Sequence, residues 1–194
     1  MAIVNTMTDI QQFRHNQLGL LTDEKGVYAL CDLEGVPIYV GKSTDGIRTR
    51  VRRHLTSARS DVIANRLIDV WEVAFVWGWP TNSNQEIAEF ESRLFTELNS
   101  QSPLMNSQNP PALNNTSLVL PAKDVVQILP DEEISTRLNP RNRFARQAQQ
   151  VSFLLDYILE IKSNEQMQRS LRAHFDRLTK YHDEYQRGVN PAIN

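Results

Sequence analysis

The sequence predicts a mixed α/β domain followed by a pair of C-terminal helices. Two short β-rich runs surround a tight turn in the first half of the chain, and amphipathic helical patterns follow them. The last 50 or so residues carry two apolar stripes at helical spacing. Five of the nine prolines lie between residues 103 and 130, and they separate the two parts.

The first elements form a helix and a β-hairpin. Ile10, Phe13 and Leu18 have helical spacing, with Thr8 as the N-terminal cap. A proline near the start of the second strand is tolerated there, and Gly41 is expected to end that strand. The elements expected, in order, are a helix at 8–20, a strand at 26–32, a turn at 33–35 and a strand at 36–40.

The next elements are two helices, a strand and a third helix. Ile47, Val51 and Leu55 form one row of a helix over residues 46–58. A shorter helix is expected at 60–69. Alternating apolar residues indicate a strand at 71–77. Ser83 and Glu86 have the spacing of a capping box at the start of a helix over 83–99.

After Pro103 the chain changes character. The proline content predicts an extended segment or linker over 103–130, because proline interrupts helices. Residues 141–162 and 164–187 are expected to form an antiparallel helical hairpin. Its apolar stripes have two uses that the residues leave open, namely completing the core or forming a dimer interface.

The distribution of charge qualifies the net charge. The 194 residues carry a formal charge of −2, which argues against binding nucleic acid through bulk charge. However, residues 42–54 and residues 137–150 each carry a net charge of +4, which leaves −10 on the rest of the chain. The first cluster contains Lys42, Arg48, Arg50, Arg52 and Arg53, and the second contains Arg137, Arg141, Arg143 and Arg146. The second cluster fits a solvated helix face paired with acids as well as it fits a phosphate-binding face.

Cysteine content and hydropathy restrict the class of protein. Cys31 is the only cysteine, so an internal disulfide and a cysteine-based zinc site are excluded. This usage favours a reducing compartment such as the cytoplasm. No apolar run approaches 18 residues, and residues 1–12 do not have the pattern of a secretory signal, so we expect no membrane association.

Several polar residues fall where they could form one phosphodiester-cleaving site. Tyr28 and Tyr39 lie on adjacent strands of the hairpin, and Arg50 and His54 share a helix face. Such a site combines a carboxylate for a divalent metal, an arginine for phosphate and a tyrosine or histidine that moves a proton. Taken singly, each residue also fits a packing or solvated role. The full set is Tyr28, Tyr39, Lys42, Arg50, His54, Glu91 and Asn106.

The order of these residues resembles the GIY-YIG endonuclease family. Gly26-Val27-Tyr28 and Tyr39-Val40-Gly41 are similar to its paired signature. Arg50 matches the catalytic arginine of the following helix once one extra residue near Gly46 is allowed. His54 matches the histidine of the restriction and homing branches. Glu91 matches the metal-binding glutamate, although Pro103 and Asn106 come about three residues later than in the family.

The resemblance implies a small, mainly antiparallel sheet flanked by helices and hydrolysis of DNA with one divalent cation, Mg²⁺ or Mn²⁺. Glu91 would bind the metal and Arg50 would stabilise charge on the phosphate. Tyr28 or Tyr39 would help to deprotonate the attacking water, with Lys42 or His54 nearby. A tyrosine in this role needs a neighbouring cation to lower its pKa from about 10. Asn106 would support the site through hydrogen bonds.

The expected function is therefore a Mg²⁺-dependent DNA endonuclease of a restriction or phage-defence type. The alternatives are a structure-specific repair nickase and a nucleic-acid-binding or interaction module without cleavage, and RNA is not excluded as a substrate. A homodimer through the C-terminal helices would suit a symmetric DNA site. Arg48, Arg52, Arg53, Arg141, Arg143 and Arg146 are the expected phosphate contacts. The predicted division is an N-terminal helical segment at 1–23, the nuclease domain at 24–108, a linker at 109–140 and the helical hairpin at 141–190.

Overall fold

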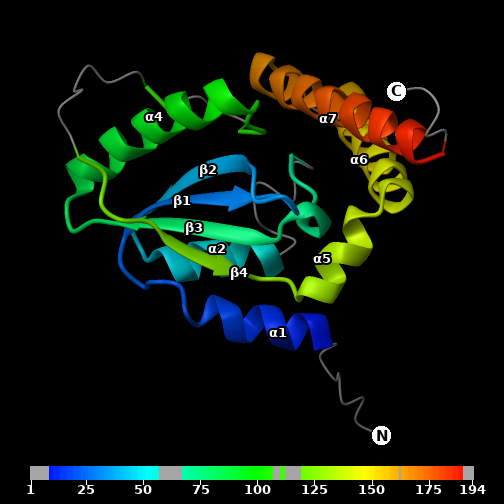
Figure 1. The fold of residues 1–194 in the computed structure, drawn as a ribbon. Helices are drawn as coiled ribbons and strands as arrows, with labels where there is room; N and C mark the ends of the chain where they lie inside the picture. The colour runs from blue at the N-terminus through cyan, green and yellow to red at the C-terminus, as the bar shows by residue number, and fades with distance from the viewer. Residues whose placement is uncertain (1–8, 57–66, 107–109, 112–118, 162, 190–194) are drawn as a thin grey trace, which may run out of the picture.

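An antiparallel sheet and its helices make up the computed structural model, which describes residues 9–56, 67–106, 110–111, 119–161 and 163–189 (Figure 1). Within this part of the chain the strands form a four-stranded sheet in the order β2-β1-β3-β4. All neighbouring strands are antiparallel. The strands are β1 (Gly26–Cys31), β2 (Pro37–Ser43), β3 (Phe75–Pro80) and β4 (Asp124–Gln127).

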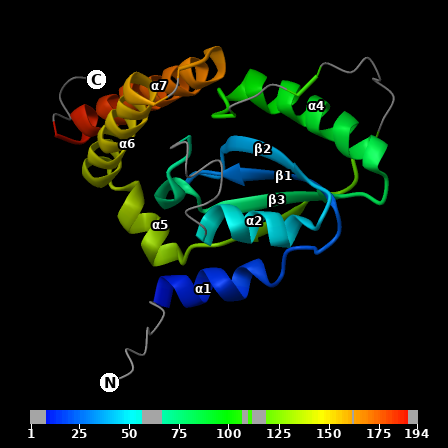
Figure 2. The same ribbon diagram turned by 180° about the vertical axis from the view of Figure 1, so that it is seen from behind.

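Helices cover both faces of this sheet (Figure 1). α4 (Asn84–Gln101) lies over one face, and α2 (Ile47–Thr56) and α1 (Asp9–Leu18) lie below the other. α5 (Asp131–Leu138), α6 (Pro140–Glu160) and α7 (Glu165–Val189) stand along one end of the sheet (Figure 2). The predicted α/β class with a C-terminal helical pair is confirmed.

The hairpin is confirmed, but its second strand is longer than predicted. β2 continues through Gly41 to Ser43, so Gly41 does not end it. Gly41 instead lies opposite Tyr28 in the strand register. A glycine inside a strand often marks a close approach of another group, and that is its role here.

The predicted strand at 71–77 is wrong in its first half. Val70–Glu72 form a 3₁₀ turn (η1), because Asp69 caps it by accepting a hydrogen bond from the backbone N–H of Trp71. β3 therefore begins at Phe75. The helix predicted at 60–69 lies outside the described residues up to 66, and residues 67–69 are not helical.

The predicted capping box at α4 is formed, and the hydroxyl of Thr81 bridges its two residues. Ser83 accepts a hydrogen bond from the backbone N–H of Glu86 at 3.4 Å. The Glu86 carboxylate binds the hydroxyl of Thr81, which in turn accepts from the backbone N–H of Ser83. Thr81 thus joins the two halves of the box.

The proline-rich stretch is more structured than predicted. β4 pairs with β3 at the edge of the sheet, and α5 follows at once, with three acidic residues in its first turn. Acidic side chains at a helix N-terminus interact favourably with the helix dipole. The interpretation of 109–140 as an extended linker is therefore wrong at α5, although the division into domains itself stays a prediction.

Two apolar clusters form the core on the two faces of the sheet. One lies between the sheet and α4 and contains Val27, Val40 and Phe90. The other contains Tyr28 and Val51 together with Val151, Leu154 and Leu171 of the C-terminal helices. These positions of the α6 and α7 stripes therefore complete the core of the α/β domain. Phe153, Leu159 and Ile161 of the α6 region and Phe175 of α7 stay exposed.

No helix in the described part of the chain is long and apolar enough to cross a membrane.

Candidate active site

Three aromatic side chains meet on the α2 face of the sheet. The hydroxyl oxygen of Tyr28 (β1) lies 2.6 Å from Nε2 of His54 (α2). The Tyr39 ring (β2) is 6.2 Å from that of Tyr28 and 5.8 Å from that of His54, measured between centroids. Tyr28 and His54 are fully buried, whereas Tyr39 is half-buried. The structure thus brings together the two signature tyrosines and the histidine.

Gly41 closes over the Tyr28 hydroxyl. A Cβ atom at Gly41 would lie 2.5 Å from the hydroxyl oxygen of Tyr28 and 2.8 Å from the Tyr39 ring. Both distances are far shorter than van der Waals contact, so only glycine fits there. The last residue of the Tyr39-Val40-Gly41 signature therefore makes room for the tyrosine of the first.

Arg50 places a positive charge beside this cluster. Burial raises the pKa of Tyr28 well above its ordinary value, and neighbouring Tyr39 raises it further. Arg50 opposes these effects through its charge and a hydrogen bond to Tyr28. The net pKa is raised, so Tyr28 is a neutral phenol at pH 7. The requirement that a cation lower the pKa below its usual value is therefore not met at Tyr28.

Lys42 and Glu91 form a pair on the other face of β2. Side chains alternate along a strand, so Lys42 points toward α4 while Gly41 faces Tyr28. The ammonium of Lys42 lies 2.8 Å from Oε2 of Glu91, whose side chain is 15% exposed. Tyr28, Tyr39, Arg50 and His54 thus lie on one face of the sheet and Lys42 and Glu91 on the other, and consecutive residues of β2 join the two groups.

Glu91 is a single carboxylate site. In the part of the chain that the structure describes, no group of three or more His, Cys, Asp or Glu side chains could hold a metal ion. Mg²⁺ is commonly bound by one or two carboxylates and otherwise by water and substrate phosphate. The donor set at Glu91 fits that mode.

Asn106 holds the edge of β2. Its amide oxygen accepts from the backbone N–H of Val40 at 3.0 Å, and its amide nitrogen donates to the carbonyl of Val40 at 2.6 Å. The N–H of Met105 also donates to the carbonyl of Ile38 at 2.7 Å. Asn106 is buried, and these contacts fix the strand between Tyr39 and Gly41.

Two arginines of the first cluster bind groups of the protein itself. Nε of Arg48 donates to the carbonyl of Leu21 at 2.7 Å, and Arg53 pairs with Asp45 at 3.3 Å. Arg53 is exposed, while Arg48 and Arg52 are half-buried. That these three residues contact DNA stays a prediction.

The second arginine cluster mostly binds acids of the protein itself. Arg143 is 1% exposed and contacts Glu34 at 2.8 Å, Glu72 at 3.3 Å and Asp32 at 3.4 Å. The expectation that Arg143 binds DNA is wrong, because these three carboxylates enclose its guanidinium.

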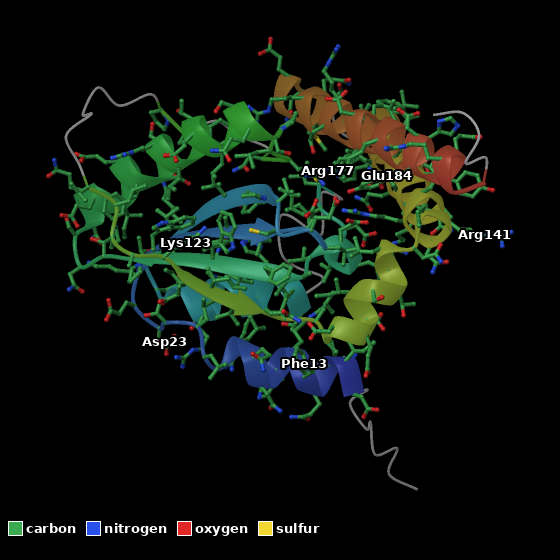
Figure 3. All side chains as sticks on the ribbon, in the orientation of Figure 1. Phe13, Asp23, Lys123, Arg141, Arg177 and Glu184 are labelled. Atoms are coloured by element: carbon green, nitrogen blue, oxygen red, sulfur yellow. The ribbon has the colours of Figure 1, made fainter. Side chains whose placement is uncertain are left out.

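Arg146 and Arg137 have internal partners too. Arg146 makes two hydrogen bonds to Asp69, one of 2.8 Å, and Arg137 binds Glu133 and the carbonyl of Trp71. Arg141 is exposed at the outer side of α6 (Figure 3). Of the three DNA contacts predicted in this cluster, Arg141 is thus exposed, Arg146 is half-buried and Arg143 is buried.

The Arg143 site forms a charged junction between the α/β domain and the C-terminal helices. Arg177 of α7, on the side of the helix that faces the sheet, pairs with Asp32 at 2.7 Å (Figure 3). Lys180 pairs with Glu34 at 2.6 Å, and the Arg143 guanidinium lies 4.0 Å from the centroid of the Tyr181 ring. Burial raises the pKa of Glu72 to about 6, which Arg143 opposes. We call Asp32, Glu34, Glu72, Arg143, Arg177 and Lys180 the charged junction.

Comparison with known families identifies the class to which this fold and site belong. Residues 24–106 match the GIY-YIG catalytic domain. Residues 24–106 therefore form a GIY-YIG catalytic domain, and the match supports membership of the GIY-YIG endonuclease superfamily and, in general, a nuclease activity on DNA. No curated protein matches the chain significantly. The matched segment contains every predicted residue of the candidate active site.

Proposed function

We propose that this protein is a Mg²⁺-dependent DNA endonuclease that cuts within duplex DNA as part of a restriction or phage-defence activity. The observation that carries the proposal is the buried hydrogen bond of 2.6 Å between Tyr28 and His54. It lies beside Arg50, and Lys42 of β2 pairs with Glu91 of α4 on the other face of the sheet. This combination supplies a proton acceptor, a phosphate-binding cation and a metal-binding carboxylate.

The proton of the attacking water passes to His54 through the tyrosines in this proposal. Tyr28 is fully buried, so the half-buried Tyr39 is the tyrosine that water can reach. Tyr39 accepts the proton of the water as it passes its own to Tyr28, to which it is hydrogen-bonded. Tyr28 passes its proton to Nε2 of His54. The water oxygen bonds to phosphorus, and the bond from phosphorus to the leaving oxygen breaks.

A neutral phenol at Tyr28 suits this relay. The raised pKa of Tyr28 keeps its proton in place at pH 7, so Tyr28 both donates and accepts a hydrogen bond. Arg50 approaches the same hydroxyl, and its guanidinium can stabilise the negative charge that develops on the phosphate. Asn106 keeps Tyr39 and Gly41 in register through Val40.

Glu91 is the residue that would hold Mg²⁺ or Mn²⁺. A bound divalent cation stabilises charge on phosphate and leaving oxygens. Lys42 pairs with the Glu91 carboxylate at 2.8 Å. Its side chain is 49% exposed, so it is free to turn from Glu91 toward a phosphate.

The DNA contacts and the assembly are part of the proposal. Arg53 and Arg141 are the exposed members of the predicted phosphate-binding set, and Arg48, Arg52 and Arg146 are half-buried. A homodimer would cut both strands of a symmetric site. His54 supports the restriction or phage-defence role, because the restriction and homing branches have histidine at the matching position.

Cleavage of supercoiled plasmid, with mapping of the ends, tests the proposal. The protein with Mg²⁺ is expected to give discrete linear fragments, and EDTA is expected to stop the reaction. Glu91→Ala and Arg50→Ala are expected to lose cleavage while keeping the thermal unfolding curve of the parent protein. Nicked circles alone would indicate a repair nickase, and binding without cleavage would indicate an inactive module. Full activity in both variants would contradict the site assignment.

A further inference from the structure

A short segment of chain lies between the edge strand of the sheet and α7. This segment, Leu104–Asn106, is buried along its whole length. On one side it hydrogen-bonds the backbone of β2 through Met105 and Asn106. On its other side, two successive residues of α7 bind its carbonyls. Arg169 donates to the carbonyl of Asn106, and the hydroxyl of Ser170 donates to that of Met105 at 3.5 Å.

Arg169 also contacts the helix that carries Glu91. Its guanidinium lies 5.4 Å from the ring centroid of Phe95 in α4, within the range of a cation–π contact. Phe95 is four residues after Glu91, so the two side chains lie on one side of the helix. Lys42 is carried by β2 and Glu91 by α4, and Arg169 is connected to both elements. It binds Asn106, which holds β2, and it contacts Phe95 of α4.

We infer that Arg169 is a positioning residue that sets the distance between Lys42 on β2 and Glu91 on α4. The inference deepens the proposed function and rests on it for its activity readout. Arg169 is in α7, which lies outside the segment that matches the GIY-YIG domain. According to this inference, the catalytic geometry therefore depends on a C-terminal helix as well as on the matched segment. Since a misplacement of about 1 Å can cost on the order of 10²-fold in rate, one such contact has a measurable effect.

Arg169→Met is the direct test, because methionine keeps an unbranched apolar stem against Phe95 but removes the donor. We expect kcat to fall by about 10²-fold with little change in the KM for DNA. The Mg²⁺ concentration needed for half-maximal rate is expected to rise several-fold, and Arg169→Lys is expected to restore most of the rate. Arg172→Ala is the matched control, since Arg172 is an exposed arginine on the same helix and lines a surface pocket together with Arg169.

Hydrogen exchange supplies a readout that does not need activity. In Arg169→Met, the amides of residues 36–43 are expected to exchange several-fold faster than in the parent protein, and in Arg172→Ala at the parent rate. If the parent protein shows no cleavage, the proposed function fails while this exchange still decides the role of Arg169. Unchanged exchange and kcat in Arg169→Met would overturn the inference. The inference would also be overturned if the KM for DNA rose equally in Arg169→Met and Arg172→Ala and the salt dependence of DNA binding became shallower by about one. Both changes are expected when a phosphate contact is lost.

Discussion

Tyr28 and His54 share a hydrogen bond of 2.6 Å across 26 residues of sequence. Both side chains are at most 1% exposed. A buried phenol and imidazole that satisfy one another are inexpensive to bury, so the pair is compatible with a stable core. It also places the Tyr28 hydroxyl in direct hydrogen-bond contact with a ring nitrogen of histidine.

Removing the Tyr28 hydroxyl should separate catalysis from folding. Tyr28→Phe keeps the ring and is expected to lower the single-turnover cleavage rate by about 10² to 10⁴-fold, the usual contribution of general acid–base catalysis. Tyr181→Phe is the control, because Tyr181 is another fully buried tyrosine and its hydroxyl accepts from Arg177 at 3.2 Å. That variant should keep its rate. Equal rates for both variants would argue against the relay.

Gly41 should not tolerate a methyl group. Gly41→Ala puts a Cβ atom 2.5 Å from the Tyr28 hydroxyl oxygen, so Tyr28 must move. We expect a loss of about 1–3 kcal/mol in the free energy of unfolding and a loss of most of the cleavage activity. Gly188→Ala is the control, since nothing lies within 4 Å of a Cβ atom there. Chemical unfolding and plasmid cleavage of both variants measure the difference.

Arg143 should matter for stability rather than for DNA binding. Arg143→Met leaves Glu72 without its main cation and is expected to cost about 3–5 kcal/mol, as for other broken buried ion pairs. Arg141→Met, on the exposed side of α6, should change stability by less than about 0.5 kcal/mol. Urea unfolding compares the two variants. A stable Arg143→Met protein with weakened DNA binding would restore the phosphate-contact hypothesis.

His174 should make the protein less stable in acid. Its Nε2 lies 2.8 Å from the carbonyl of Leu67, and Nδ1 lies 2.9 Å from the side-chain amide nitrogen of Gln147. Burial lowers its pKa to about 4, so the unfolded chain binds the proton more readily. The stability contributed by neutral His174 is present above about pH 6.5 and is lost as the pH falls to about 4, in total about 3 kcal/mol.

The difference between the parent protein and His174→Gln isolates this effect from that of Glu72. The pKa of Glu72 is raised, so its contribution runs the other way and is lost as the pH rises from about 4.5 to 6. The free energy of unfolding, measured from pH 4 to pH 7.5, is expected to fall more steeply toward acid in the parent protein. Parallel curves would show that His174 binds its proton equally in both states.

Local patterns predicted most of the elements that carry the site. Spacing and capping residues located α2 and α4, and the paired signatures located β1 and β2 together with Tyr28 and Tyr39. Gly41 was misread as a strand end, because sequence distinguishes a terminating glycine from one that admits a neighbouring side chain only once the partner strand is known. The 3₁₀ turn at 70–72 was missed for a similar reason, since alternation of apolar residues does not reveal a cap such as Asp69.

Long-range pairing was beyond the reach of the sequence. Arg143 lies 109 residues from Glu34 and 71 from Glu72, so spacing gives no sign that its charge is already neutralised. Arg169 lies 63 residues from Asn106 and binds its backbone carbonyl, an acceptor that every residue carries. The order of the predicted residues indicated the class of chemistry, while their division between two faces of β2 became visible only in the folded chain.

The charged junction determines how far the catalytic half of this chain can be transplanted. A chimaera that takes residues 24–106 and joins them to a foreign recognition module would remove Arg143 and Arg177 from Asp32 and Glu72, and would uncover the part of the core that α6 and α7 complete. Such a fusion is expected to express poorly unless α6 and α7 accompany the domain, because exposed apolar surface promotes aggregation. For engineers of new nucleases, the smallest portable unit of this protein therefore includes helices that its family signature does not cover.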